Sequence, residues 1–327
     1  MSLKDTRRGV ILFNLGGPEK LQDVRPFLYN LFSDPEIIRI KNDVLRKLIA
    51  WLIATTRQRK SRALYRQIGG GSPLRKITDA QAAALRTRLE ARGCPANVYV
   101  GMRCWKPTID DAVKQMLSDR ITRLVVLPLF PQFSVTTTGS CVRYFMSVAD
   151  KSGLSSEAEF EYVDAWFDNR LYIEAMAELI QEAMRGFPDP NPEKIQLLYS
   201  AHSIPARYVE EGDPYLAQTR KTVELINQRL SSTSASTLAF QSKVGPVKWL
   251  EPATQDVLAQ FGRDRIPQVL AIPISFVSDH IETLQEIDIF YKQLARKAGI
   301  KEFRRAASLN LYAKFIDALA DIALRAF

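Results

Sequence analysis

The fold of this 327-residue chain is decided by the stretch Val269-Leu270-Ala271-Ile272-Pro273-Ile274-Ser275-Phe276-Val277-Ser278-Asp279-His280-Ile281-Glu282. Its first six residues form a short apolar run, which is typical of a buried strand. A polar cluster follows directly, and a helical pattern begins after it. Ligand sites in open α/β sheets lie at the carboxyl ends of the strands. The stretch therefore predicts a parallel sheet with a site where this strand ends.

Both histidines of the chain lie where a predicted strand ends. His280 belongs to the stretch above, and His202 lies in Tyr199-Ser200-Ala201-His202-Ser203-Ile204-Pro205, directly after another apolar run. The Ile204-Pro205 pair predicts a turn, so we expect His202 to face a cleft rather than the core. A chain so poor in imidazole is expected to use both copies for proton or metal chemistry.

Short apolar runs alternate with longer amphipathic stretches almost throughout the chain. The predicted strands are 9–15, 98–102, 124–129, 159–163, 195–199, 237–241 and 269–274. The predicted helices include 78–92, 108–118, 169–185, 214–230, 252–261, 281–297 and 308–325. This alternation predicts βαβ units and an α/β fold of two doubly wound halves, each with a parallel sheet flanked by helices. We expect an N-terminal domain over 8–166, a C-terminal domain over 167–305, and a closing helix in 306–327 that packs back on the N-terminal domain.

The composition favours a globular protein with an anionic partner. Hydrophobic residues make up 46% of the chain and charged residues 25%, and Lys plus Arg (45) exceed Asp plus Glu (36) by nine. Such an excess suits nucleic acid, an acidic membrane surface or a carboxylate-bearing small molecule. The basic residues are mostly scattered, and only residues 57–62 form a dense group. No nucleic-acid motif is present, so we expect no nucleic-acid partner.

The three cysteines, Cys94, Cys104 and Cys141, are odd in number and widely spaced. This pattern argues against a disulfide framework, a zinc site or a cysteine-ligated cluster. Residues 1–8 are polar and charged, so we expect no signal peptide. No run reaches the roughly 18 apolar residues that a membrane-spanning helix needs. We therefore expect a cytoplasmic protein.

One region before Gly69 has an unusually apolar helical face. Val44, Leu45, Leu48, Ile49 and Leu52 share this face, and Trp51 and Ile53 widen it. Either the helix packs on its own domain, or it forms an amphipathic lip that holds an apolar ligand or touches lipid. The sequence leaves both interpretations open.

The polar cluster after the last strand has two explanations. Glu282 and Glu286 share a helix face, where like charges cost about 0.2–0.5 kcal/mol. A capping box with Asp279 at the N-cap and Glu282 at the third position is the structural explanation. The functional explanation is a site for Fe(II) or a similar divalent ion, since imidazole and carboxylate are suitable ligands.

Two glycine clusters, Asn14-Leu15-Gly16-Gly17-Pro18 and Gly69-Gly70-Gly71-Ser72-Pro73, follow neither nucleotide-binding pattern. The first lacks the third glycine of a dinucleotide fingerprint, and the second lacks the lysine of a phosphate loop. Each is either a tight turn or a place where backbone amides come close to a flat ligand.

Taken together, these motifs resemble the signatures of the ferrochelatase family. The resemblance runs from about residue 9 to about residue 321. The residues that carry it are the two glycine clusters, Pro131-Gln132-Phe133-Ser134 running into Thr137-Thr138-Gly139-Ser140, Ser200-Ala201-His202-Ser203-Ile204-Pro205, Gln241-Ser242-Lys243-Val244-Gly245-Pro246 with Trp249-Leu250, and Ser278-Asp279-His280-Ile281-Glu282-Thr283-Leu284.

The resemblance implies two Rossmann-like halves around a porphyrin cleft. It also implies insertion of Fe(II) into protoporphyrin IX, the last step of haem synthesis, with release of two protons. Fe(II) would be a substrate, and no cofactor would be bound permanently. The apolar lip would be associated with porphyrin entry and with peripheral contact to the inner membrane.

The resemblance also implies roles for individual residues. His202 and Glu282 would be catalytic and bind the metal, with Glu282 facing His202 across the macrocycle. Asp279, His280 and Glu286 would form a supporting acidic row. The candidate porphyrin-binding residues, including basic and hydroxyl groups for the propionates, are Leu15, Arg66, Arg103, Ser134, Ser242, Trp249 and Phe276.

The sequence departs from the family at several positions. Phe290 stands where some members continue the acidic row, so we expect no path of three glutamates. Val135 replaces a cluster-ligating cysteine of animal members, so we expect no iron–sulfur cluster. Leu15 and the Gly-Gly-Pro turn favour protoporphyrin over coproporphyrin.

The alternatives are a chelatase for another metal or for a tetrapyrrole such as coproporphyrin, and a haem or porphyrin carrier without catalysis. A carrier would need the cleft but not both titratable clusters. A nicotinamide oxidoreductase is disfavoured, because the glycine fingerprint is missing.

Overall fold

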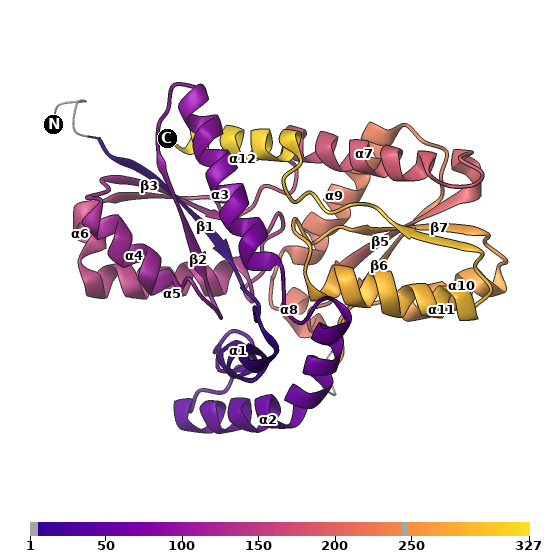
Figure 1. Cartoon of the computed structure of the whole chain (residues 1–327), viewed down its shortest axis with the longest axis horizontal. Helices are drawn as coiled ribbons and strands as arrows, with labels where there is room; N and C mark the ends of the chain where they lie inside the picture. Colours follow the sequence, from indigo (N-terminus) through magenta and orange to yellow (C-terminus); the bar gives the residue numbers. More distant parts are fainter. Residues whose placement is uncertain (1–5, 244–246) are drawn as a thin grey trace. The chain divides into compact units, whose positions relative to one another are not determined.

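The computed structural model describes residues 6–243 and 247–327 (Figure 1). The chain divides into two compact units. The first comprises the described part of Met1–Trp166 together with Ile316–Phe327, and the second is Phe167–Phe315. Each unit is built around its own sheet of four parallel strands. Two parallel sheets flanked by helices confirm the predicted fold class.

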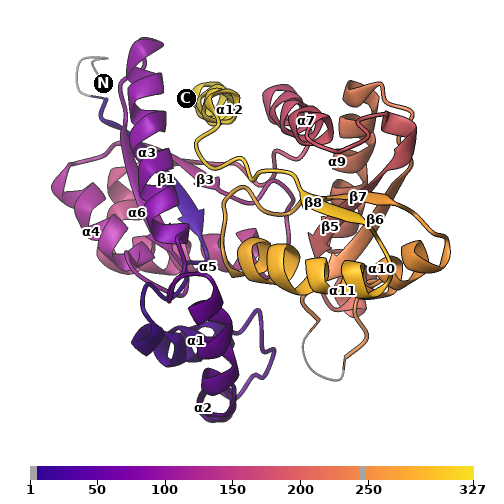
Figure 2. The ribbon, with the colours of Figure 1, turned by 45° about the vertical axis from the view of Figure 1, so that its right-hand side comes forward.

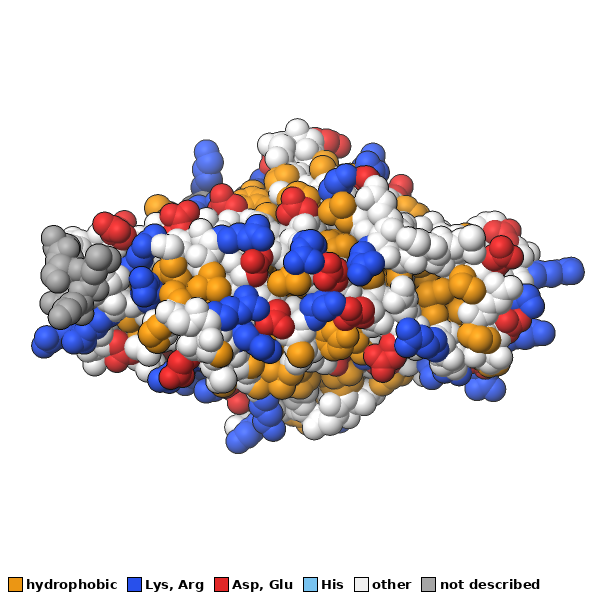
Figure 3. All heavy atoms as spheres, turned by 90° about the horizontal axis from the view of Figure 1, so that it is seen from above, with side chains coloured by type: hydrophobic (Ala, Val, Ile, Leu, Met, Phe, Trp, Pro, Cys, Tyr) orange, Lys and Arg blue, Asp and Glu red, His pale blue; other side chains and the backbone are white. Residues whose placement is uncertain are grey.

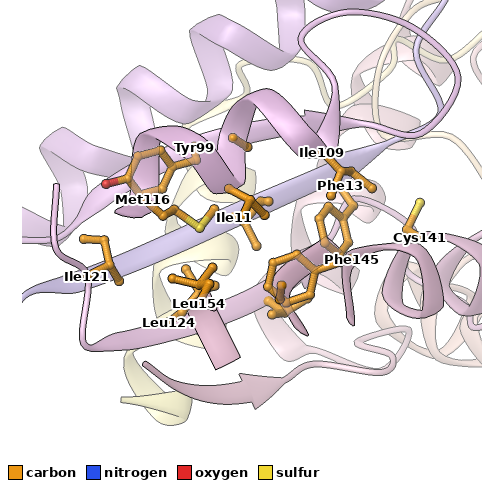
Figure 4. Packing of buried hydrophobic residues seen from close by; sticks show 14 residues of the cluster. Ile11, Phe13, Tyr99, Ile109, Met116, Ile121, Leu124, Cys141, Phe145 and Leu154 are labelled. Atoms are coloured by element: carbon orange, nitrogen blue, oxygen red, sulfur yellow. The ribbon is translucent and has the colours of Figure 1, made fainter. Parts of the chain in front are cut away.

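The first sheet has its two most buried strands in the centre. Its order is β2 (Asn97–Met102), β1 (Arg8–Asn14), β3 (Arg123–Pro128) and β4 (Glu159–Tyr162). Successive side chains of a strand point to opposite faces. Ile11 and Phe13 therefore share one face, where they pack with residues of α4 (Ile109–Ser118) and α5 (Thr138–Ser152) (Figure 4). Asn14 points to the other face, where its amide Nδ2 donates to Thr78 Oγ1 of α3 (Leu74–Ala91) at 3.3 Å.

The second sheet repeats this arrangement. Its order is β6 (Ser236–Gln241), β5 (Ile195–His202), β7 (Gln268–Pro273) and β8 (Glu302–Arg305). One face is covered by α10 (Thr254–Arg263), the π-helix η4 (Glu282–Tyr291) and α11 (Lys292–Lys297). The other face is covered by α7 (Arg170–Arg185) and α9 (Tyr215–Leu230) (Figure 2). Leu198 of β5 packs with Ile287 of η4, whereas the next residue, Tyr199, donates its hydroxyl hydrogen bond to Asn227 of α9.

The remaining elements connect these layers or extend from them. They are η2 (Leu21–Asp23), α1 (Val24–Phe32), α2 (Asp43–Gln67), α6 (Leu154–Glu157), η3 (Pro192–Lys194), α8 (Ala206–Glu210) and α12 (Ala313–Ala326). In α12, Asp317 forms ion pairs with Arg88 and Arg92 at 3.2 and 2.6 Å. The predicted domains 8–166, 167–305 and 306–327 stay a prediction, because compactness does not test whether a unit folds by itself.

The apolar face predicted for the helix before Gly69 lies on α2 and is open to solvent. Val44 is 77% exposed, Leu48 61% and Leu52 55%. Packing of this face on its own unit, one of the two interpretations, is therefore wrong for these three side chains. Within the part of the chain that the structure describes, no helix is both long enough and apolar enough to span a membrane.

Candidate active site

Three neighbouring strands of the second sheet bring the candidate residues to one edge. His202 is the last residue of β5, Ser242 directly follows β6, and the loop after β7 leads into η4 at Glu282. In the register of the sheet, His202 lies beside Gln241 of β6, and Ser200 lies beside Pro273 of β7. The edge is therefore the carboxyl end of the sheet, where the sequence predicted a site.

The alternation of β5 decides which way His202 faces. Leu198 and Ser200 share the face that η4 and α10 cover, since Leu198 packs with Ile287 and Ser200 bonds to Gln241 and Thr254. His202 is two residues further along and so points to the same face.

His202 and Glu282 are in direct contact. The Nδ1 atom of His202 lies 2.8 Å from Oε2 of Glu282, and the two side chains are 40% and 23% exposed. The expectation that Glu282 faces His202 across a macrocycle is therefore wrong, because a hydrogen bond of this length leaves no room for a ring between the two groups. The carboxylate instead accepts the Nδ1 proton, so Nε2 is the imidazole nitrogen that can take up a proton or bind a cation.

Ser242 joins the two glutamates of η4. Its hydroxyl lies 2.9 Å from Glu282 Oε2 and 2.5 Å from Glu286 Oε2. Gln241 donates from Nε2 to Glu286 Oε2 at 3.0 Å, and Tyr291 donates to Glu286 Oε1 at 3.1 Å. Ser242 thus contacts both carboxylates, whereas Gln241 and Tyr291 hold the carboxylate of Glu286 alone.

The pair shifts the ionisation of both of its members. Burial opposes the charged form of Glu282, but His202 and the hydrogen bonds outweigh it and lower the pKa of Glu282 to about 2. Burial acts to lower the pKa of His202, yet the neighbouring Glu282 carboxylate outweighs this effect and leaves the pKa raised above its ordinary value. The site therefore holds an ionised carboxylate against a strengthened base.

Glu286 differs from Glu282 in its ionisation. Burial raises the pKa of Glu286, and repulsion by the Glu282 carboxylate raises it further. The Ser242 hydroxyl has one proton and cannot donate to both glutamates at once. A proton on Glu286 satisfies the second contact, which agrees with the direction of the shift.

Two residues that the sequence did not single out hold the backbone of His202. Tyr215 donates its hydroxyl proton to the carbonyl of His202 at 2.8 Å, and its oxygen lies 2.6 Å from Ser275 Oγ. The NH of His202 lies 3.4 Å from the same serine oxygen. The position of Ser275 could be predicted from the sequence, because it is the first polar residue after the apolar run of β7. Nothing near Tyr215 in the sequence indicated this contact.

His280 and Phe276 lie together beside the pair. Their rings are 4.5 Å apart between centroids, and Phe276 is 6.3 Å from the ring of His202. His280 Nδ1 lies 3.1 Å from the carbonyl of Ser278. Burial lowers the pKa of His280 below its ordinary value, so this imidazole is the weaker base of the two.

Asp279 does not join the acidic row. Its carboxylate accepts hydrogen bonds from Ser308 and Asn310 at 2.8 Å each and pairs with Arg305 at 3.1 Å. The proposed capping box is also wrong, because the NH of Asp279 donates to Asn310 and the Glu282 side chain bonds to His202. Asp279 therefore anchors the start of the helix rather than the acidic site.

Four of the predicted porphyrin contacts belong to the first unit. Leu15 follows β1, Arg103 follows β2, and Ser134 lies in the loop between β3 and α5, so these three are near the carboxyl ends of the first sheet. Ser134 is buried, with its hydroxyl 3.0 Å from Thr136 Oγ1. Arg66 lies on α2 and is exposed.

Arg103 already has a carboxylate partner. Its Nη2 lies 3.1 Å from Asp34, whose side chain is fully buried, and its Nε donates to Ser140 Oγ at 2.9 Å. The guanidinium also stacks on the ring of Tyr144, 4.3 Å from the centroid. The structure thus shows an arginine engaged within its own unit, and a role with a propionate stays a prediction.

Trp249 and the residues before it complete the second unit's candidates. The indole Nε1 of Trp249 is buried and finds no hydrogen-bond partner among the described residues. A buried donor without an acceptor is an exception in folded proteins. Val244, Gly245 and Pro246 of the sequence motif lie outside the described residues.

The described residues contain no group of three or more His, Cys, Asp or Glu side chains arranged to hold a metal ion. The His202–Glu282 pair nevertheless offers a nitrogen and a carboxylate, which suit Fe(II). Two protein ligands with open positions fit an ion that passes through as a substrate better than one that stays.

The comparisons with known proteins agree along nearly the whole chain. A family model described as Ferrochelatase matches residues 7–326. The chain is 50% identical over 319 residues to proteins named ferrochelatase from Gloeothece citriformis and from a Synechocystis strain, covering 97% of this chain and 82% of each relative. A ferrochelatase from Gloeobacter violaceus is 48% identical over 317 residues, which cover 97% of this chain and 96% of the relative.

Solved structures support the fold. SirB from Bacillus subtilis with Fe3+ has a TM-score of 0.58 at 10% identity, covering 98% of this chain and 96% of that chain. The cobalt complex of the sirohydrochlorin chelatase SirB from Bacillus subtilis subspecies spizizenii has a TM-score of 0.54 at 10% identity, covering 97% and 93%. At this identity the likeness shows a shared fold and nothing finer. The family match and the 50% identity, in contrast, show that the chain belongs to the ferrochelatase family, whose enzymes insert iron into a porphyrin in haem synthesis.

Proposed function

We propose that this enzyme inserts Fe(II) into protoporphyrin IX and that His202 and Glu282 act on the reacting atoms. The observation that carries the proposal is the direct contact between an imidazole and an ionised carboxylate at the carboxyl ends of three strands. The reaction removes two pyrrole protons and exchanges the water ligands of the ion for ring nitrogens. It therefore needs a base and an anionic group at one place.

His202 supplies the base. Glu282 holds the proton on Nδ1, so the lone pair for an incoming pyrrole proton is on Nε2. The carboxylate also stabilises the imidazolium that forms, since it raises the pKa of His202. Glu286, with its raised pKa, provides a second place for a proton close to Glu282.

The enzyme must also bind the porphyrin ring firmly enough to bend it. The nitrogen lone pairs of a planar porphyrin point to the centre of the ring, and bending the macrocycle exposes them. Binding energy from contacts elsewhere on the ring offsets the cost of this bending. The aromatic side chains of the second unit proposed for this contact are Phe276, beside His202, and Trp249, whose indole NH has no partner among the described residues. The placement of the two units, and with it the predicted cleft, stays a prediction.

The proposal is tested by the variant His202→Ala, assayed anaerobically with Fe(II) and protoporphyrin IX. We expect iron insertion to be lost while porphyrin binding, measured by fluorescence, is kept. Wild-type turnover in this variant at saturating Fe(II) would remove His202 from the mechanism.

The same assay separates the two glutamates. We expect Glu282→Gln to impair turnover far more than Glu286→Gln, because only Glu282 contacts His202 directly. Equal and small losses in the two variants would assign both carboxylates a merely structural role.

The assay also decides between substrates. Preference for coproporphyrin, or for another metal over Fe(II), would support one of the alternative chelatases. Porphyrin binding without any metal insertion by the wild-type protein would support a carrier.

The finer assignments concern cofactors and location. We propose that no iron–sulfur cluster is held, because the common clusters take four cysteine ligands and the sequence has three cysteines, which are widely spaced. We further propose a cytoplasmic protein whose α2 touches the membrane surface, since α2 combines an exposed apolar face with basic residues.

A further inference from the structure

We infer that Ser242 is a positioning residue, whose hydroxyl fixes the carboxylates of Glu282 and Glu286 for the reaction at His202. The inference rests on the proposed function of the His202–Glu282 pair. It replaces the role in porphyrin binding that the sequence predicted for Ser242.

The first support is the geometry of the hydroxyl. Ser242 Oγ lies within hydrogen-bond distance of Oε2 of both glutamates, at 2.9 and 2.5 Å. The same Oε2 of Glu282 bonds to His202. Ser242 and His202 thus hold one oxygen of Glu282 from two sides, and none of the described residues forms a hydrogen bond to the other oxygen, Oε1. This arrangement leaves Oε1 available to a cation.

The second support is the backbone. Ser242 has φ of +65°, in the left-handed region that residues other than glycine rarely adopt. A glycine would relieve this strain, which costs on the order of 1–3 kcal/mol at such sites. The strained residue lies directly after β6, where the chain leaves the sheet and the hydroxyl reaches η4. The backbone at this position favours glycine, so the hydrogen bonds of the hydroxyl explain why a serine is present.

The surroundings argue against a contact between Ser242 and a porphyrin propionate. The hydroxyl has one proton, and both of its hydrogen-bond contacts are already taken up by the two glutamates. A third carboxylate, from a propionate, would be repelled by the negative charge of Glu282. The hydroxyl is therefore suited to organising the glutamates and unsuited to binding an anion.

The inference is tested with Ser242→Ala, measuring kcat and KM for Fe(II) together with the dissociation constant for protoporphyrin IX. Loss of a hydrogen bond to a charged group corresponds to roughly a 10- to 100-fold fall in kcat/KM for iron. Porphyrin affinity should stay within about two-fold, because no contact with the ring is removed. Ser242→Asn should restore part of the lost activity, since asparagine tolerates the left-handed region and its amide donates two hydrogen bonds.

Two further variants separate the hydroxyl from the strain. Ser242→Gly removes both, and should lose activity as the alanine variant does; it also carries the test if the alanine variant fails to fold. Ser231→Ala is the matched control, because Ser231 also has a positive φ, of +47°, but ends α9 and bonds to the carbonyl of Gln228. We expect its kinetics to equal those of the wild type.

The outcomes are distinct. Unchanged kcat/KM for iron in both Ser242→Ala and Ser242→Gly would overturn the inference. Weakened porphyrin binding with unchanged kcat would restore the predicted porphyrin contact. Absence of iron insertion by the wild-type protein would overturn the proposed function itself.

Discussion

The two histidines show how one residue type acquires opposite properties from its neighbours. Both rings are partly buried, and burial alone lowers the pKa of each. His202 has the Glu282 carboxylate on Nδ1, whereas His280 has only a backbone carbonyl there. The pKa of His202 is consequently raised and that of His280 lowered.

This contrast predicts the outcome of an NMR titration of the free enzyme with labelled histidine. The His202 ring should titrate above the ordinary value of 6.5 and the His280 ring below it. In Glu282→Gln the larger raising influences disappear, while burial and the weaker influence of Glu286 remain, so the pKa of His202 should fall below its wild-type value. Because the chain has two histidines, the variant His280→Asn assigns the signals. A pKa of His202 unaffected by Glu282→Gln would contradict the ion pair.

Acidic residues three positions apart also have separate roles. Asp279 accepts from Ser308 and Asn310 and pairs with Arg305, whose side chain is 11% exposed. We expect Asp279→Asn to lower the free energy of unfolding by about 1–3 kcal/mol, because it leaves these buried donors poorly satisfied. Urea denaturation measures this loss. Glu282→Gln is the comparison, since it should impair iron insertion with a smaller loss of stability.

The sequence predicted the positions of some site residues but not the contacts between them. His202 and Glu282 could be predicted because strand ends are readable from apolar runs. The contact between them could not, since residues 80 positions apart meet only through the pairing of β5 with β7 and the path of the loop before η4. Asp279 was misassigned because sequence spacing does not show that Arg305 lies behind it.

At the scale of elements, the apolar runs located seven of the eight strands found in residues 6–243 and 247–327. They missed β8, Glu302–Arg305, which has one buried residue among charged neighbours, as edge strands often do. The helix predicted over 281–297 begins as the π-helix η4, whose wider turn cannot be told from an α-helix by the apolar pattern.

The glycine clusters illustrate a question that only the structure answers. A Cβ atom added to Gly71 would lie 2.0 Å from the backbone oxygen of Glu19, and the NH of Ser72 donates to the carbonyl of Pro18 at 2.7 Å. The turn after β1 and the turn before α3 therefore pack on each other. The space that Gly71 leaves is filled by the protein's own chain rather than by a ligand.

This packing predicts a large effect of Gly71→Ala on stability. Overpacking typically costs about 1–3 kcal/mol, and here the obstacle is backbone, which cannot move aside as a side chain can. Gly70→Ala is the control, because its Cβ would meet nothing within 4 Å and only its φ of +92° opposes the change. Thermal unfolding should show the larger loss for Gly71→Ala. Equal losses would mean that backbone conformation, not close approach, explains both glycines.

At the scale of the whole molecule, the net charge of +9 is unevenly distributed. On the face that Figure 3 shows, Lys and Arg side chains alternate with Asp and Glu side chains. Helix α2 departs from this mixture, because its sequence contains seven Lys or Arg residues and one Asp. The excess of six positive charges lies on the element that also exposes Val44, Leu48 and Leu52.

This coincidence predicts that the protein binds anionic vesicles through α2. Apolar side chains gain free energy on entering the interface, and each basic residue near an anionic surface contributes about 1 kcal/mol. Co-sedimentation should therefore show binding to vesicles containing phosphatidylglycerol, weaker binding to neutral vesicles, and a decrease as salt is raised. We expect Leu48→Glu to reduce binding at least about ten-fold, because it removes about 1.5–3 kcal/mol of apolar transfer and adds a repelled charge. Leu311→Glu is the matched control, since Leu311 is also an exposed leucine, at 50%, but lies outside α2. Equal effects of the two substitutions, or binding independent of both lipid charge and salt, would exclude α2 as the membrane-binding element.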